Sequence, residues 1–284
     1  MSISGKSRFE LLTFGMLLRL IMILFLAVFL VPILFSIFTS LKSRPEFYQN
    51  VWGPPRELQF TNYIQAFITG KMSAYFLNSV IISLFSLLLI QICCLLLAYA
   101  LARMHIPFAN MILLFLFFIQ ILPTESQIIP LYIMFSRVGL FRTPYWGIIL
   151  AYVGWSVPGI SIIMKNFFET IPAELMESAR IDGSGELRTM VQIVIPLMKS
   201  VMATCFVFSF NYVWGEMLWA RIATALTDKG IPLTIGLLNF QGMYETNWPM
   251  LTAAICIIMI PLFAVFLFTQ KYFIAGLTAG SVKG

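Results

Sequence analysis

The chain is poor in charged residues and has almost no histidine. Asp, Glu, Lys and Arg make up 11% of its 284 residues, and His105 is the single histidine. Soluble domains average about 25% charged residues, so an ordinary soluble domain is excluded. One histidine, with no partner acid or nucleophile in a recognisable pattern, gives no basis for a catalytic site. We therefore expect no catalytic residue in this chain, and a membrane enzyme is disfavoured.

Metal-ligand spacing and clustered positive charge are also missing. Cys93, Cys94, Cys205 and Cys256 all fall in apolar stretches, where cysteine behaves as a small apolar side chain, so we expect no metal site. The formal net charge is +6, but the Lys and Arg residues are scattered singly rather than gathered in a stripe. This distribution suits the flanks of membrane helices and predicts no nucleic-acid partner.

Apolar residues dominate what remains. They form 60% of the chain, and the mean hydropathy is +0.91. A helix needs about 20 apolar residues to cross a bilayer, and the runs of this length predict an all-α, polytopic membrane protein with six spans and a single transmembrane domain, 1–284. Lipid is therefore an expected partner. The expected spans are 15–38, 78–101, 110–135, 145–164, 197–220 and 250–269. The first run is too long for a signal peptide and lacks a cleavage site, so we expect it to be retained.

The loop 166–196 is the one strongly charged segment. Pro172 and Glu174 suit the start of a short helix, and Gly183 suits its end because glycine tolerates the left-handed conformation. A second short helix over 186–194 would follow, with Pro196 opening the next span. A docking knob and an ordinary amphipathic loop at the membrane surface are both compatible with this pattern. Between residues 174 and 188 the charged residues are Glu174, Glu177, Arg180, Asp182, Glu186 and Arg188.

The spacing in this loop resembles a family motif. Glu177-Ser178-Ala179, three residues, Gly183, nine residues, then Ile193, one residue and Ile195-Pro196 are similar to the EAA loop of ABC importer permeases. The family form is E-A-A, three residues, G, nine residues, I-x-L-P. Ser178 in place of Ala and Ile195 in place of Leu are the two departures, and both are small.

Other stretches extend the resemblance over nearly the whole chain. They are similar to the carbohydrate-uptake branch of these permeases, and within it to the six-helix second permease of the maltose-type importers. The stretches are Tyr75–Ser79, Ala98–Arg103, Ile129–Tyr132 and Gly276–Gly280, closing on Val282–Gly284.

The resemblance implies a type I ABC importer permease in a prokaryotic plasma (inner) membrane, with both termini in the cytoplasm. Basic residues divide almost evenly between the two sides, so the orientation depends on the resemblance. In this family the EAA loop seats in a groove of an ATPase subunit. The ATPase-coupling residues would be Glu177, Ser178, Ala179, Asp182, Gly183, Ile193 and Pro196, with Gly280 and Lys283 of the C-terminal tail as further contacts.

The expected partners are a second, different permease, an ATPase dimer and an extracytoplasmic solute-binding protein. The chain has no G-x-x-x-x-G-K-[ST] phosphate loop, and Gly280–Lys283 does not fit one. ATP and Mg would therefore be bound by the partner ATPase, with no cofactor in this chain. The implied function is half of a translocation pathway for a sugar or oligosaccharide. An acidic saccharide stays possible because Arg137, Arg142 and Arg221 would lie near the outer mouth.

Polar side chains within the spans are candidates for that pathway, since such residues are costly in a membrane. Packing between helices is the alternative. Gly215 stands where the family often has Asn in a W-N-E-like stretch, which leaves a contact at this position open. The candidate substrate-pathway residues are Glu125, Gln127, Asn211, Tyr212, Trp214, Glu216 and Trp219.

An ion-coupled secondary transporter is the alternative function. Glu125 and Glu216 could then serve as coupling groups near the bilayer midplane. Such transporters are commonly built from internal repeats, and the chain has no visible repeat. Dependence of uptake on ATP rather than on an ion gradient would separate the two functions.

Overall fold

The computed structural model describes residues 8–143, 145–227, 229–242 and 244–279, with side chains described from residue 15 to residue 271. Within these residues five helices are long and apolar enough to span a membrane, and a bent pair makes a sixth. The predicted all-α architecture with six apolar segments is therefore confirmed. The long helices are α1 (Arg8–Ser40), α4 (Met72–Arg103), α7 (Trp146–Phe168), α10 (Ile195–Gly215) and α13 (Trp248–Ala279), and the bent pair is α5 (Ala109–Ile121) and α6 (Thr124–Arg137).

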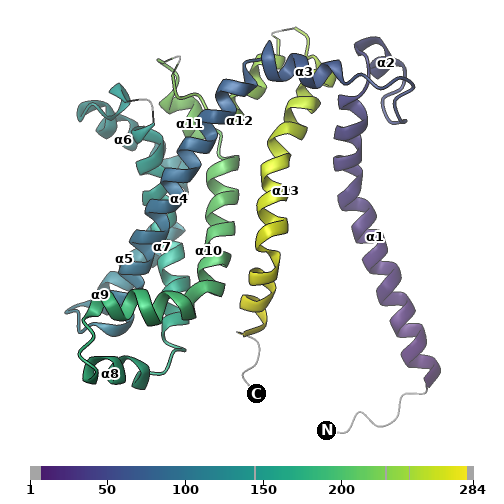
Figure 1. Ribbon diagram of the computed structural model, residues 1–284. Coiled ribbons are helices and arrows are strands. Elements are labelled where there is room, and N and C mark those ends of the chain that lie inside the picture. Colours follow the sequence, from purple (N-terminus) through teal and green to yellow (C-terminus); the bar gives the residue numbers. More distant parts are fainter. Residues whose placement is uncertain (1–7, 144, 228, 243, 280–284) are drawn as a thin grey trace. The chain divides into compact units, whose positions relative to one another are not determined.

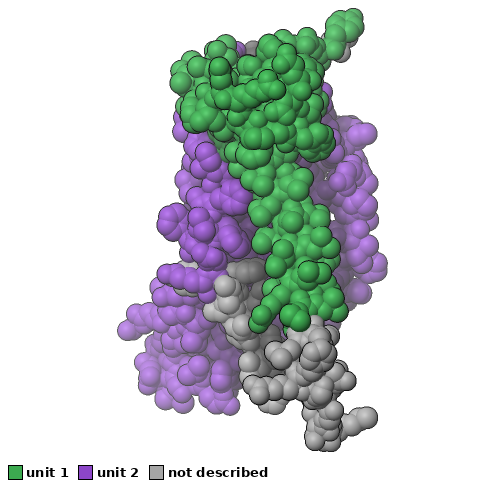
Figure 2. Space-filling model, turned by 90° about the vertical axis from the view of Figure 1, so that its right-hand side faces the viewer, with its two compact units in different colours: residues 1–70, 237–257 green, residues 71–236, 258–284 purple. Residues whose placement is uncertain are grey.

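Short helices connect the long ones (Figure 1). They are α2 (Arg44–Gln49), α3 (Thr61–Ile68), η1 (Leu140–Arg142), α8 (Glu174–Ile181), α9 (Glu186–Thr189), the π-helical turn η2 (Met190–Val194), α11 (Leu218–Ala223), α12 (Leu233–Gly236) and η3 (Leu237–Phe240). The chain forms two compact units, one of residues 1–70 and 237–257 and one of residues 71–236 and 258–284 (Figure 2).

The first unit contains the apolar helix α1 and a more polar segment that follows it, residues 41–70. The apolar side chains of α1 are exposed within the unit. At its end the Lys42 side chain is buried and donates to the carbonyl oxygens of Asn50 at 2.5 Å and Val51 at 3.0 Å. Asn62 in turn donates to the carbonyl of Lys42 at 2.8 Å. Burial lowers the pKa of the Lys42 ammonium. The segment between the first two spans is thus an ordered helical cap.

The second unit has a core of three long helices. α4 packs along α7, and α10 packs against both of them. Ile90, Met164 and Cys205, one from each helix, are fully buried in the shared cluster. Close packing of this kind holds the helices as a rigid body. The segments at the two ends of α4, α7 and α10 are therefore attached to the same rigid bundle.

The start of α4 holds a later loop in place. The Asn78 amide donates to the carbonyl of Ile231 at 2.9 Å, and the Ser79 hydroxyl accepts from the amide of Leu233 at 2.7 Å. Tyr145 at the start of α7 donates to the Asn78 side-chain oxygen at 3.0 Å. The stretch Tyr75–Ser79, which the sequence singled out, therefore fixes α12 on α4.

The third expected span, 110–135, is broken in two. α5 and α6 meet at 101°. Leu122 is extended, with φ −69° and ψ 125°, and Pro123 follows it. A proline disfavours helical geometry in the residue before it and cannot donate to the helix ladder. The apolar run hid this break, because its length alone fits one straight span.

The fifth expected span, 197–220, ends earlier than predicted. α10 stops at Gly215, and Glu216 is extended with ψ 132°. The separate helix α11 begins at Leu218. Of the candidate pathway residues after Gly215, Glu216 thus lies in the turn and Trp219 lies in α11, rather than both lying on one continuous helix.

Candidate functional site

The charged loop folds as predicted around Gly183. Gly183 has φ +76°, its amide donates to the Arg180 carbonyl at 3.0 Å, and the Ser184 amide donates to the Ala179 carbonyl at 2.9 Å. These two bonds form a Schellman motif, which ends a helix with a residue in the left-handed conformation. A side chain at this backbone geometry would be strained. Glycine therefore fixes where α8 ends and where the chain turns towards α9.

The second part of the loop is continuous with a long helix. α9 leads through the π-helical turn Met190–Val194 straight into α10, so one helical segment extends over Glu186–Gly215. Pro196 lies just after the wide turn, where its missing amide is accommodated. The second of the two short helices expected in the charged loop, α9, is thus the first turn of one long helical segment. α8 and α9 lie at the opposite end of the second unit from α6 and α11 (Figure 1).

Side chains from α4 anchor this segment. The Arg103 guanidinium donates to the carbonyl of Phe168 at 2.7 Å and to that of Ile171. The Tyr99 hydroxyl donates to the Glu186 carboxylate, which also pairs with Arg180 at 2.8 Å. Sequence reasoning missed Tyr99 and Arg103 as anchors. Their spacing of four residues, which puts them on one face of α4, was the available signal.

The predicted coupling residues divide by exposure. Ala179 is buried, and with Met176 it holds α8 against the rest of the unit. Ile193 is half-buried. The exposed members are Glu177, Ser178, Asp182, Gly183 and Pro196. The carboxylate of Glu177 has no hydrogen-bond or ion-pair partner in the described part of the chain. Gly280 and Lys283 lie outside the described residues.

Two large apolar side chains accompany these exposed residues. Ile181 is 86% exposed and Leu187 is 72% exposed. They flank the Gly183 turn, one at the end of α8 and one in α9. Exposed apolar side chains beside unpaired charge are common at surfaces that bind another protein.

At the other end of the bundle, Glu216 is fully engaged by its own fold. Its carboxylate accepts from the Tyr152 hydroxyl at 2.7 Å, from the Trp219 amide at 2.7 Å and from the Ala220 amide at 3.1 Å. The two hydrogen bonds from backbone amides cap the start of α11. The geometry favours the packing alternative for Glu216, because its carboxylate is occupied by donors from this chain.

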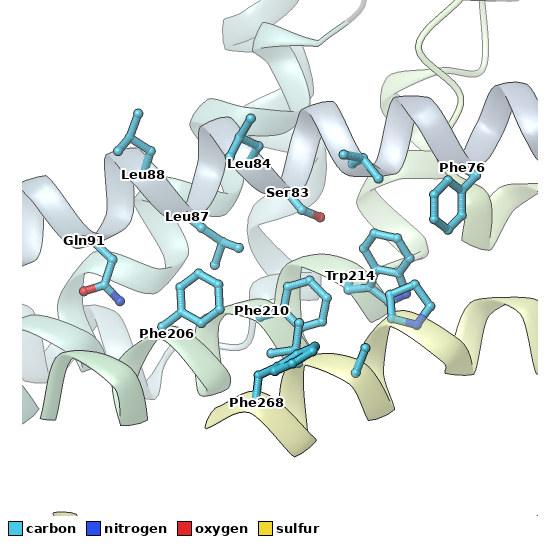
Figure 3. A pocket seen from close by; sticks show the side chains of 14 residues that line it. Phe76, Ser83, Leu84, Leu87, Leu88, Gln91, Phe206, Phe210, Trp214 and Phe268 are labelled. Carbon is cyan, nitrogen blue, oxygen red and sulfur yellow. The ribbon is translucent and has the colours of Figure 1, made fainter. Parts of the chain in front are cut away.

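The two tryptophans of this stretch are also occupied. Trp219 is fully buried, and its indole N–H donates to the Gly147 carbonyl at 3.1 Å. The Trp214 indole donates to the Ile258 carbonyl at 3.1 Å. Trp214 lines an apolar cavity of about 560 Å³ among α4, α10 and α13, together with phenylalanine and leucine side chains (Figure 3). This lining suits apolar groups, and the geometry favours packing for both indoles.

The remaining pathway candidates are more accessible. Glu125 is exposed, and Asn211 is exposed beside a second cavity of about 480 Å³ between α10 and α13. The Gln127 side-chain oxygen accepts from the Trp155 indole at 3.0 Å. Tyr212 is half-buried, and its ring packs edge-on against Tyr152 with centroids 6.0 Å apart. Within the described residues, no group of acidic, histidine and cysteine side chains could hold a metal ion.

Comparison with known proteins gives a consistent result. The family described as binding-protein-dependent transport system inner membrane component matches residues 94–278. A melibiose/raffinose/stachyose import permease protein of Bacillus subtilis is 34% identical over 254 residues, which cover 89% of this chain and 91% of that protein. A galactooligosaccharides transport system permease protein of the same organism is 30% identical over 81% of this chain and 82% of its own length.

A solved structure shares the fold. A chain from the crystal structure of a bacterial ABC transporter involved in the import of the acidic polysaccharide alginate superposes with a TM-score of 0.82. The match covers 95% of this chain and 99% of that one, at 23% sequence identity. At this identity the likeness concerns the fold.

Proposed function

The chain belongs to the family of inner membrane components of binding-protein-dependent transport systems and is a permease subunit of an ABC importer, and we propose that this importer carries a neutral saccharide or oligosaccharide. The similarity to a melibiose, raffinose and stachyose permease over most of both chains supports this substrate class. The ion-coupled alternative finds no support among the relatives.

The observation that carries the mechanism is the continuous helical segment Glu186–Gly215. We propose that α8 and α9 seat on an ATPase subunit, with Glu177, Asp182 and Gly183 at the contact and with Ile181 and Leu187 filling apolar space. Closure of an ATPase dimer around ATP and Mg would then move α9 as a rigid body. Because α9 continues into α10, the movement would reach the far end of the bundle, as alternating access requires.

The partners follow from this arrangement. One permease supplies half of a pathway, so a second, different permease would complete it. An ATPase dimer would supply energy, and an extracytoplasmic solute-binding protein would deliver the saccharide. For α8 and α9 to reach an ATPase, this segment must face the cytoplasm. The proposal therefore places both chain termini in the cytoplasm and the protein in the inner membrane. Glu125, Gln127, Asn211 and Tyr212 are the proposed pathway residues, with Glu216, Trp214 and Trp219 as their support.

The first experiment is purification of the tagged chain in mild detergent, followed by identification of the proteins that accompany it. Recovery of an ATPase and a second permease is the expected result. The reconstituted complex would then be tested for ATP-dependent uptake of labelled melibiose, raffinose, diacetylchitobiose and an oligouronate. Uptake of a neutral sugar supports the proposal. A lone chain with no ATPase, or uptake of the oligouronate alone, would overturn it.

A further inference from the structure

A third cavity lies where the broken third span meets α7 and α10. Its volume is about 280 Å³, close to the lower bound of about 300 Å³ for ordinary ligand pockets, so it has room for a single ring-sized group. None of the side chains that line it is charged. The aromatic ones are Trp155, Phe208 and Tyr212, and the other polar ones are Gln120, Thr124, Ser156 and Ser209.

Ser209 on α10 is the unusual group in this cavity. The residue is only 2% exposed, and its hydroxyl has no hydrogen-bond partner among the described residues. A buried hydroxyl without a partner costs free energy, and most buried polar groups in proteins are paired. Ser209 lines the cavity, and its hydroxyl oxygen is itself covered in this structure. Rotation of the side chain about χ1 would bring the hydroxyl to a ligand hydroxyl in the cavity and supply the missing partner.

The aromatic side chains Trp155 and Tyr212, which line the cavity, are held in position by contacts with other residues of the unit. The Trp155 indole donates to Gln127 at 3.0 Å, and its ring packs edge-on against Trp219 with centroids 5.6 Å apart. Tyr212 packs edge-on against Tyr152. Rings fixed in this way offer flat apolar surfaces at little cost in side-chain entropy. Such surfaces suit the apolar faces of a sugar ring, whose hydroxyls still need polar partners.

Gly159 on α7 leaves space for the side-chain amide of Gln120 on α5. A Cβ atom on Gly159 would lie 2.7 Å from the Gln120 side-chain oxygen. Any other residue at position 159 would therefore displace this amide. The break at Pro123 places Thr124 at the cavity as well, in the first turn of α6. Backbone amides in a first turn have no acceptor within the helix, and broken membrane helices commonly form substrate sites.

We propose that this cavity is a saccharide subsite of the transport pathway. One pyranose ring lies against Trp155 and Tyr212, and its hydroxyls bond with Ser209, Gln120 and Thr124. The uncharged lining selects a neutral ring rather than a uronate. The proposal depends on the proposed function, since only a saccharide importer needs such a subsite.

The test uses the whole importer in proteoliposomes with raffinose-loaded binding protein at saturation. Raffinose imported per ATP hydrolysed is measured for Ser209→Ala and for Gly159→Ala, which displaces Gln120 without removing a polar group. Loss of one hydrogen bond weakens binding about three- to tenfold, so each variant should lower this ratio by about that factor. Two variants keep the test open if one of them fails to assemble.

The matched control is Ser86→Ala on α4. Ser86 is fully buried and its hydroxyl also has no partner among the described residues, but it does not line the cavity. This variant should keep the wild-type ratio. Wild-type ratios in Ser209→Ala and Gly159→Ala would overturn the subsite while the importer function stands. A wild-type importer that moves none of the neutral sugars tested would overturn both proposals.

Discussion

Two glutamates at opposite ends of the second unit show how differently this chain uses the same side chain. Glu177 in α8 is exposed and has no polar partner for its carboxylate in the described part of the chain. Glu216, after α10, accepts hydrogen bonds from Tyr152, Trp219 and Ala220. The sequence made both of them candidates for function. The structure leaves the first free for a partner and commits the second to the fold.

The physical reason is the surroundings of each carboxylate. An acid among membrane helices is costly unless donors surround it, so the chain supplies them. An acid at a water-exposed helix end needs no such donors. Comparable side chains therefore support stability at one end and remain available for recognition at the other. Changes at the two ends should separate stability from coupling.

The largest expected effect on stability is at Glu216, which follows α10. Glu216→Ala removes three hydrogen bonds and leaves the Tyr152 hydroxyl without its acceptor, so the free energy of unfolding should fall by about 3 kcal/mol. Thermal unfolding of the purified complex would measure it. Glu125→Ala, at an exposed position, should change it by less than about 0.5 kcal/mol. Unchanged stability combined with lost uptake in Glu216→Ala would instead make Glu216 a substrate contact.

Next in size is the turn between α8 and α9. Gly183→Val places a β-branched residue at φ +76°, which costs about 1–2 kcal/mol locally and should distort the turn. Import should be lost while ATP hydrolysis continues. Gly185→Val is the matched control: a Cβ meets no atom within 4 Å at either glycine, but Gly185 has φ −72°. Normal uptake in Gly183→Val would contradict the coupling role.

The anchor between α4 and α9 should have a smaller effect. Glu186→Ala removes the bond from Tyr99 and the exposed ion pair with Arg180, together about 1 kcal/mol. Tyr99→Phe removes the first of these alone. Thermal unfolding of both single variants and of the double variant would give the coupling between them. Additive effects would contradict a direct contact between the two side chains.

The smallest effect on stability is expected for Glu177→Ala, within about 0.5 kcal/mol, because this carboxylate bonds to nothing in the described fold. Its consequence should instead be less ATPase recovered with the purified permease. Glu174→Ala, an exposed acid in the same helix, serves as the comparison. Full ATPase recovery with Glu177→Ala would remove Glu177 from the coupling contact.

Local rules predicted a good part of this protein. Apolar run length gave the six apolar segments, and the Gly183 turn followed from glycine's tolerance of positive φ. The break at Pro123 had a visible proline but was hidden by the apolar run around it. The π-helical turn at Met190–Val194 and the end of α10 at Gly215 had no local signal strong enough to overrule a continuous span.

The sequence by itself determined the membrane class, the helical fold and the position of the charged segment, because bilayer thickness and backbone preferences act on neighbouring residues. Only the tertiary structure decided which polar side chains are occupied and which are free. Glu216 and Trp219 find their partners in Tyr152 and Gly147, more than 60 residues away, and Ser209 finds none. Pairing of this kind depends on which helices lie side by side, and that is set by packing rather than by local sequence.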